Sequence, residues 1–200
     1  MGLLLRSGCR TGESHWSAAL YNATEVGRVL PIRIEGAMND VLSDVPAGAE
    51  SAPQNWAMIY RRAFGLDAEV HPGSGRLVVR AGKTLAALSM PSALGARVRG
   101  RLVDMSGSAG PIIAHPRSMR WTFLTLPADA DLTDPLLHAE MFRHYVDIAG
   151  VNAEIALPAP GTLQSDAYRL WNDAPVGDYR PLAGDVLSAV RECVAAQRMR

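Results

Sequence analysis

The segment Arg120-Trp121-Thr122-Phe123-Leu124-Thr125-Leu126 constrains the fold of this chain more than any other feature of the sequence. It concentrates aromatic, β-branched and apolar residues, which favour β-strands because they pack well on a pleated surface. No other segment carries so strong a strand signal. We therefore expect residues 120–126 to form a central strand of a sheet.

The segments before this strand alternate between helical and strand patterns. Apolar residues recur at three- and four-residue spacing over residues 56–64, which predicts a short amphipathic helix. Two β-rich runs, residues 69–71 and 76–80, flank four turn-forming residues and predict a hairpin. A further strand is expected over residues 84–90, followed by a helix that has Pro91 at its first position.

The segments after the central strand continue this alternation. Asp134 is a good N-cap, and Pro135 follows it, so a helix is expected over residues 134–148. Strands are predicted over residues 151–157 and 168–171, and a final helix carries an apolar seam of Leu182, Val186, Val190 and Val194. The pattern predicts an α+β fold, a two-layer sandwich in which helices pack on a mostly antiparallel or mixed β-sheet.

The length of 200 residues is enough for one hydrophobic core without disulfides or metals to support it. Residues 1–30 have weak periodicity, with only a short candidate helix over residues 15–21, so we treat them as a lead-in. Residues 31–200 are expected to form a single α+β domain. Within it, the Pro- and Ala-rich segment 44–55 is typical of a loop.

The expected location is the cytoplasm. The N-terminus has only three consecutive large apolar residues, Leu3, Leu4 and Leu5, which is too few for a secretory signal. No apolar run has the length that a membrane span requires, so we expect no association with a membrane. Cys9 and Cys193 lie near opposite ends of the chain and predict neither a disulfide framework nor a metal site.

Charge excludes a uniformly basic nucleic-acid-binding protein, because 20 Lys and Arg residues balance 20 Asp and Glu residues. Only a local basic face could contact phosphates. Arginines cluster in three places, two of which are candidates for such a face. One cluster includes Arg97 and Arg101 on the expected helix after Pro91; the other consists of Arg117 and Arg120 beside His115, where phosphate could be held by charge-assisted hydrogen bonds.

Asp129 and Asp131 are the candidate metal ligands. Two carboxylates that are two residues apart after a strand could share a divalent cation, as phosphoryl-transfer sites require. The alternative interpretation is a solvated turn that leads into the helix cap at Asp134. His138 and His144 are six residues apart, which does not match the spacing of zinc ligands on one helix face. The sequence has no G-x-S-x-G motif for a nucleophilic serine, and no cofactor is expected.

The second half of the chain resembles a group of bacterial bifunctional DNA primase/polymerase domain proteins, whose fold is related to the archaeo-eukaryotic primases. The resemblance rests on the segments Pro111–Pro116, Arg120–Leu124, Ala156–Pro160 and Tyr168–Trp171 and on the closing helix that begins at Pro181-Leu182, with a weaker similarity over residues 69–90. It implies metal-binding acids and a phosphate-binding histidine on the sheet. Only Asp129, Asp131 and His115 could take these roles, and none of them lies in a family motif. This departure implies a divergent member that lacks catalytic activity.

Three hypotheses for function follow. The first is a non-catalytic primase/polymerase-like module that binds a protein partner or nucleic acid. The second is a small metal-dependent nucleotidyl-transfer or phosphate-handling enzyme that uses Asp129, Asp131 and His115. The third is a homo-oligomeric structural protein, in which Ala183, Leu187, Ala195 and Ala196 widen the apolar seam of the final helix.

Overall fold

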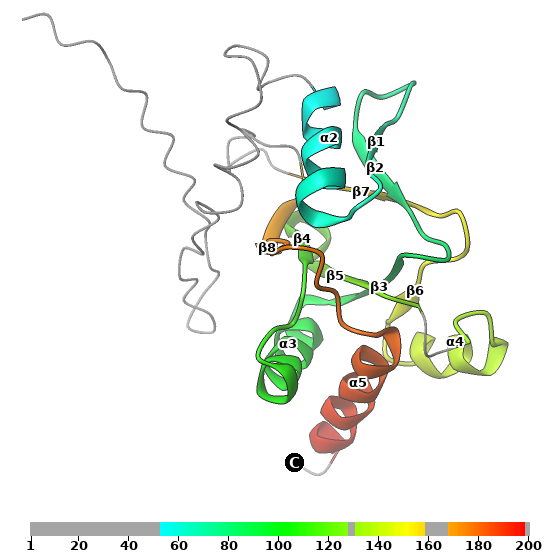
Figure 1. The fold of residues 1–200 in the computed structure, drawn as a ribbon. Coiled ribbons are helices and arrows are strands. Elements are labelled where there is room, and N and C mark those ends of the chain that lie inside the picture. Colours follow the sequence, from blue (N-terminus) through cyan, green and yellow to red (C-terminus); the bar gives the residue numbers. More distant parts are fainter. Residues whose placement is uncertain (1–52, 128–130, 159–167, 199–200) are drawn as a thin grey trace, which may run out of the picture. The chain divides into compact units, whose positions relative to one another are not determined.

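A five-stranded antiparallel sheet with the strand order β6-β3-β5-β4-β8 organises the fold (Figure 1). The computed structural model describes residues 53–127, 131–158 and 168–198. The expected helix over residues 15–21 and the candidate ligand Asp129 lie outside these residues. The five strands are β3 (Ala86–Pro91), β4 (Ile112–His115), β5 (Arg120–Thr125), β6 (Asp147–Ile148) and β8 (Leu170–Asp173).

The predicted central strand is confirmed, because β5 lies in the middle of this sheet and pairs with β3 and β4. It ends at Thr125, one residue before the predicted end. Leu126 instead forms an isolated parallel bridge with Leu182, at the start of the final helix.

A second, three-stranded antiparallel sheet has the order β1-β2-β7. The predicted hairpin forms its first two strands, β1 (Glu69–Val70) and β2 (Leu77–Arg80), and β7 (Glu154–Ala156) pairs with β2 on the other side. The turn closes where the amide of Gly75, which has a φ of 65°, donates to the carbonyl of His71 at 2.9 Å. Glycine suits this left-handed conformation because it has no Cβ.

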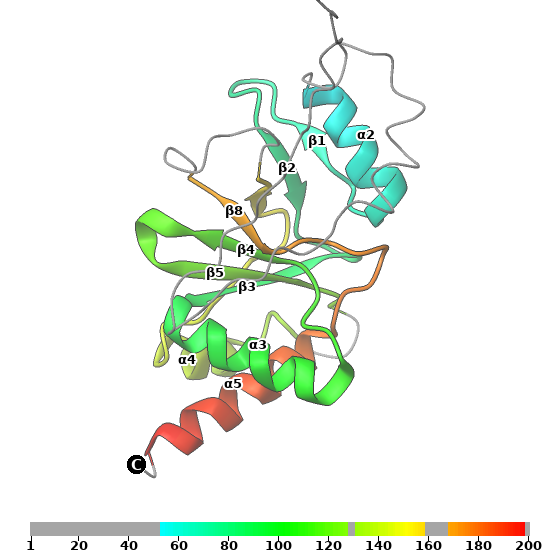
Figure 2. The ribbon, with the colours of Figure 1, turned by 90° about the vertical axis from the view of Figure 1, so that its left-hand side faces the viewer.

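Helices cover the two faces of the five-stranded sheet unequally (Figure 2). The helices α3 (Ser92–Ser106) and α5 (Ala183–Arg198) pack against each other and, with α4 (Pro135–Phe142), cover one face. The helix α2 (Pro53–Phe64) and the three-stranded sheet cover part of the opposite face. The α+β class is confirmed.

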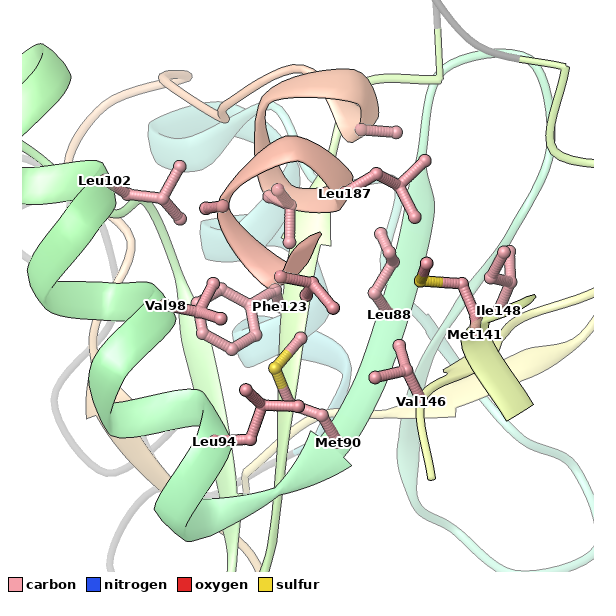
Figure 3. Close-up of a cluster of buried hydrophobic side chains, with 14 of the residues drawn as sticks. Leu88, Met90, Leu94, Val98, Leu102, Phe123, Met141, Val146, Ile148 and Leu187 are labelled. Carbon is pink, nitrogen blue, oxygen red and sulfur yellow. The ribbon is translucent and has the colours of Figure 1, made fainter. Parts of the chain in front are cut away.

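Alternate side chains of β5 supply two separate cores. Phe123 points toward α3 and α5, where it packs among Leu88, Val98 and Leu187 (Figure 3). Leu124 points the other way and packs with Ile113 and residues of α2 and the small sheet. Both Phe123 and Leu124 are fully buried, so β5 has no solvent face in its second half. This two-sided burial explains the strength of its sequence signal.

The prediction of one helix over residues 134–148 is wrong in its second half. Asp134 does cap α4, because its side chain accepts from the amide of Leu136, but the helix ends at Phe142. Tyr145 then adopts a left-handed φ of 57°, which turns the chain so that residues 147–148 pair with β3 as strand β6. Burial of Val146 and Ile148 against the sheet prevails over the helical periodicity.

Several other element boundaries also differ from the sequence prediction. The strand expected over residues 151–157 is observed only as β7, and the strand expected over 84–90 begins at Ala86. Three further shifts involve a proline or a polar residue. The helix α2 begins at Pro53, inside the expected loop 44–55, and Pro91 is the last residue of β3 and the N-cap of α3. The strand β8 begins at Leu170, so Tyr168 and Arg169 precede it. Two of these shifts place a proline at the end of an element, where its missing backbone donor costs least. The third leaves Arg169 outside β8, where its charge is less buried.

Substitution of Gly110 tests the close approach of this residue to Pro181. It has a φ of 69°, and a Cβ added to it would lie 2.4 Å from Cδ of Pro181. We predict that Gly110→Ala lowers the free energy of unfolding by about 3 kcal/mol, from left-handed strain and from overpacking. The matched control is Gly107→Ala, which has a similar φ of 78° but no heavy atom within 4 Å of the new Cβ. It should cost only about 1–2 kcal/mol in the same urea titration, and equal losses would contradict the close approach.

Candidate functional site

A row of basic residues crosses three strands at one end of the central sheet. His115 is the register partner of Arg120, and Ala114 is the partner of Leu170, which places Arg169 next to His115 on the other side. Side chains two residues apart along a strand share a face. Arg169, His115 and Arg120 therefore lie on the same face as Ile113 and Leu124, opposite α3 and α5.

His115 is a half-buried histidine held by its neighbour on β5. Its Nε2 lies 2.8 Å from Oγ1 of Thr122. Burial lowers the pKa of His115, and the positive charges of Arg169 and Arg120 lower it further. The imidazole is therefore mostly neutral at pH 7 and adds hydrogen-bonding capacity to a positive environment without adding charge.

Arg169 is the most unusual arginine on this face. It is half-buried, and its pKa is lowered by burial and by the nearby positive charge of Arg76. Among the described residues, no carboxylate forms an ion pair with Arg169 or Arg76. Two neighbouring guanidinium groups that repel each other favour the binding of an anion between them.

Arg117 extends the same positive region along the β4–β5 connection. It lies in the short 3-10 helix Pro116–Ser118, and its guanidinium carbon is 3.8 Å from the ring centroid of Tyr168. Tyr168 is 62% exposed, so much of its side chain is accessible to solvent. We call the set His115, Arg117, Arg169, Arg76 and Tyr168 the basic sheet face.

Arg120 has a structural role within this region. Its guanidinium donates to Asp147, to the Ser89 side chain and carbonyl and to the Tyr145 carbonyl, at distances of 2.5–3.2 Å. It thereby joins β5 to β3 and to the segment that leads into β6. Asp147 is occupied by this ion pair, so it does not neutralise Arg169 or Arg117.

The structure separates Arg97 and Arg101 from the basic sheet face. Both lie on α3 and interact with α5: Arg97 donates to the Cys193 carbonyl and to Gln197, and Arg101 pairs with Glu192 at 2.5 Å. Arg99, on the same helix, forms two hydrogen bonds with the buried carboxylate of Asp173. These arginines link helices and strands and have little capacity left for a ligand.

Asp131, the candidate metal ligand that the structure describes, also lies apart from His115. Asp131 accepts from the Thr133 amide at 3.0 Å and from its hydroxyl at 2.7 Å, and these bonds lower the pKa of its carboxyl. It follows the opposite end of β5, and Leu132 packs into the core on the helix-covered face. No group of three or more His, Cys, Asp or Glu side chains in the described part of the chain could hold a metal ion.

His138 and His144, whose spacing does not predict a zinc site, lie on α4 and just after it. The Nε2 of His138 lies 2.8 Å from the carbonyl of Leu132, and His144 lies in the turn after α4.

Three residues of the basic sheet face were not predicted from the sequence: Arg169, Arg76 and Tyr168. The signal for Arg169 was its place two residues before Trp171, which shares its face, but the pairing of β8 with β4 had to be known to use it.

Comparisons with protein-family models, with curated proteins and with solved structures returned no match to this chain. No helix among the described residues is long and apolar enough to span a membrane. The interpretation of the site therefore rests on its geometry.

The lowered pKa of His115 predicts a pH dependence of stability. Because the pKa is lower in the folded than in the unfolded chain, the unfolded chain binds the proton more readily as the pH falls. The contribution of His115 to stability is thus present above its unfolded pKa of about 6.5 and is lost as the pH falls toward its folded pKa. Between about pH 8 and pH 5, the wild-type protein should lose more unfolding free energy than His115→Gln in parallel urea titrations. Equal losses would show that His115 titrates normally.

Proposed function

We propose that this chain is a non-catalytic, primase/polymerase-like binding module that contacts nucleic acid through the basic sheet face. Arg169, Arg76 and Arg117 supply positive charge for phosphates, His115 supplies a hydrogen bond, and Tyr168 supplies an aromatic ring for a base. Phosphate contacts give nucleic-acid binding most of its affinity, and exposed aromatic rings add stacking with unpaired bases.

The observation that carries this proposal is the contrast between two groups of arginines. Among the described residues, carboxylates form ion pairs with Arg80, Arg99, Arg101, Arg120 and Arg191. No carboxylate in the described part of the chain pairs with Arg76, Arg117 or Arg169, the three arginines of the basic sheet face. A half-buried arginine that repels a neighbouring arginine is costly for a protein unless a ligand compensates the charge.

Single-stranded nucleic acid fits this face better than a protein partner. The exposed Tyr168 and the guanidinium of Arg117 over its ring match a stacked base next to a phosphate. An acidic peptide would use the arginines but would not need the aromatic ring. The non-catalytic part of the proposal rests on the place of Asp147: it lies on β6, with β3 and β5 between it and His115 on β4, and it is already bonded to Arg120.

Binding of fluorescently labelled single-stranded DNA and RNA oligonucleotides to the full chain tests this proposal. We expect Arg169→Ala and Arg117→Ala each to weaken binding about 5- to 20-fold in fluorescence anisotropy at low salt, and to reduce the slope of log affinity against log salt by about 0.7. The matched controls are Arg101→Ala and Arg191→Ala, which remove arginines paired with Glu192 and Glu140. They should change the affinity less than about twofold.

Two outcomes would overturn the proposal. One is the absence of oligonucleotide binding at low salt. The other is an equal loss of affinity in the control variants, which would indicate diffuse attraction to surface charge. A separate assay of primer extension with Mg²⁺ or Mn²⁺ should show no nucleotide incorporation. Activity that Asp131→Ala abolishes would favour the alternative, a metal-dependent nucleotidyl-transfer enzyme.

A further inference from the structure

The helix α4 exposes large apolar side chains to solvent. Leu136 is 79% exposed and Phe142 is 71% exposed, while Tyr145, in the turn after the helix, is 71% exposed. The other side of α4 packs against the core under α3 and α5, where Met141 is fully buried and Leu137 is in contact with it. A short helix that is apolar on both sides is typical of an element covered by protein on both sides.

The exposed residues form one stripe along the helix. Leu136, Ala139 and Phe142 follow each other at intervals of three, so they lie along one side of α4. Beside this stripe is an open hollow of about 330 Å³, lined by His138, Ala139, Phe142, Val146, Asp147 and Ile148. The stripe thus combines protruding side chains, a small residue in the middle and an adjacent depression.

We propose that a second copy of this chain covers the stripe, with the two α4 helices packed antiparallel about a twofold axis at Ala139. Such an axis places each residue opposite the one equally far from position 139 on the partner helix. Leu136 then meets Phe142 of the second copy, and Phe142 meets its Leu136. The small side chain of Ala139 lets the helix axes approach closely where they cross.

Charge complementarity supports a second copy as the occupant. The same symmetry places Arg143 and His144, at the C-terminal end of one α4, beside Pro135 and Asp134, at the N-terminal end of the other. Arg143 is exposed, and Asp134 uses one carboxylate oxygen to cap its own helix, which leaves the other available. Antiparallel α4 helices also align their dipoles favourably.

The proposed site of self-association is α4, which differs from the helix predicted from the sequence. The apolar seam of the sequence predicted self-association through the final helix, α5, with Ala183 and Leu187 among its residues. The structure shows that these two residues are buried in the core between α5 and the sheet, so they are not available to a partner. An eight-residue helix is only about 12 Å long, so the interface is at the small end and the dimer should be weak, with a dissociation constant in the micromolar range or above.

A charge-rescue experiment tests the twofold axis directly. Ala139→Lys and Ala139→Glu each place a charge where it meets the identical charge of a second copy. In sedimentation of the full chain over a range of concentrations, each variant alone should stay monomeric, whereas the wild type dimerises. An equimolar mixture of the two variants should dimerise again, because opposite charges then meet at the axis.

Both variants at position 139 are expected to fold like the wild type. Residue 139 is exposed, and Lys and Glu both favour helices. The matched controls, Ser188→Lys and Ser188→Glu, introduce the same charges at an exposed position of α5 and should dimerise like the wild type. A wild type that stays monomeric at all concentrations would overturn the proposal and point to a different protein as the partner. A dimer that both single variants retain, or a mixture that stays monomeric, would overturn it as well.

Discussion

Burial of both sides of β5 is the constraint on which the rest of the structure depends. Phe123 and Leu124 are adjacent in sequence and point into different cores, one under α3 and α5 and the other under α2 and the small sheet. Each core needs its own cover, which requires helices on both faces of the sheet. Because α2 and the small sheet cover only part of one face, the first residues of β5 and the end of β4 remain partly open, and the basic sheet face lies there.

The same region shows how one fold uses arginines in two ways. Arg120 is surrounded by acceptors from three segments and stabilises the sheet edge at β6. Arg169 is on the same face and half-buried, yet its electrostatic neighbours are Arg76 and His115, which do not compensate its charge. Stability explains the first arrangement, and we propose a bound anion to explain the second. The distinction comes from the partners of each guanidinium, since exposure and charge are similar.

The sequence predicted those parts of the fold that depend on interactions between residues close together in the chain. The central strand, the β1–β2 hairpin and the Asp134 cap follow from strand propensity, turn residues and capping chemistry. The end of α4 could not be predicted from local patterns. Ile148 fits a helical period, and only its pairing with Leu88 makes it a strand residue. Of the five residues predicted to bind phosphate, the structure places His115, Arg117 and Arg120 in one region and Arg97 and Arg101 on α3, and the site itself stays a prediction. Pairing of β8 with β4, between residues far apart in sequence, brings in Arg169, and no local pattern contains that information.

The central claim is that an anionic ligand belongs on the basic sheet face, and the pKa of His115 reports on it most directly. Arg169 and Arg120 help to lower this pKa in the free protein. A polyanion bound to the same face would offset those positive charges and raise it. Titration of the His115 imidazole by NMR, with and without a saturating single-stranded oligonucleotide, should show a higher pKa in the complex. An unchanged pKa in a protein that demonstrably binds the oligonucleotide would place the ligand elsewhere and contradict this account.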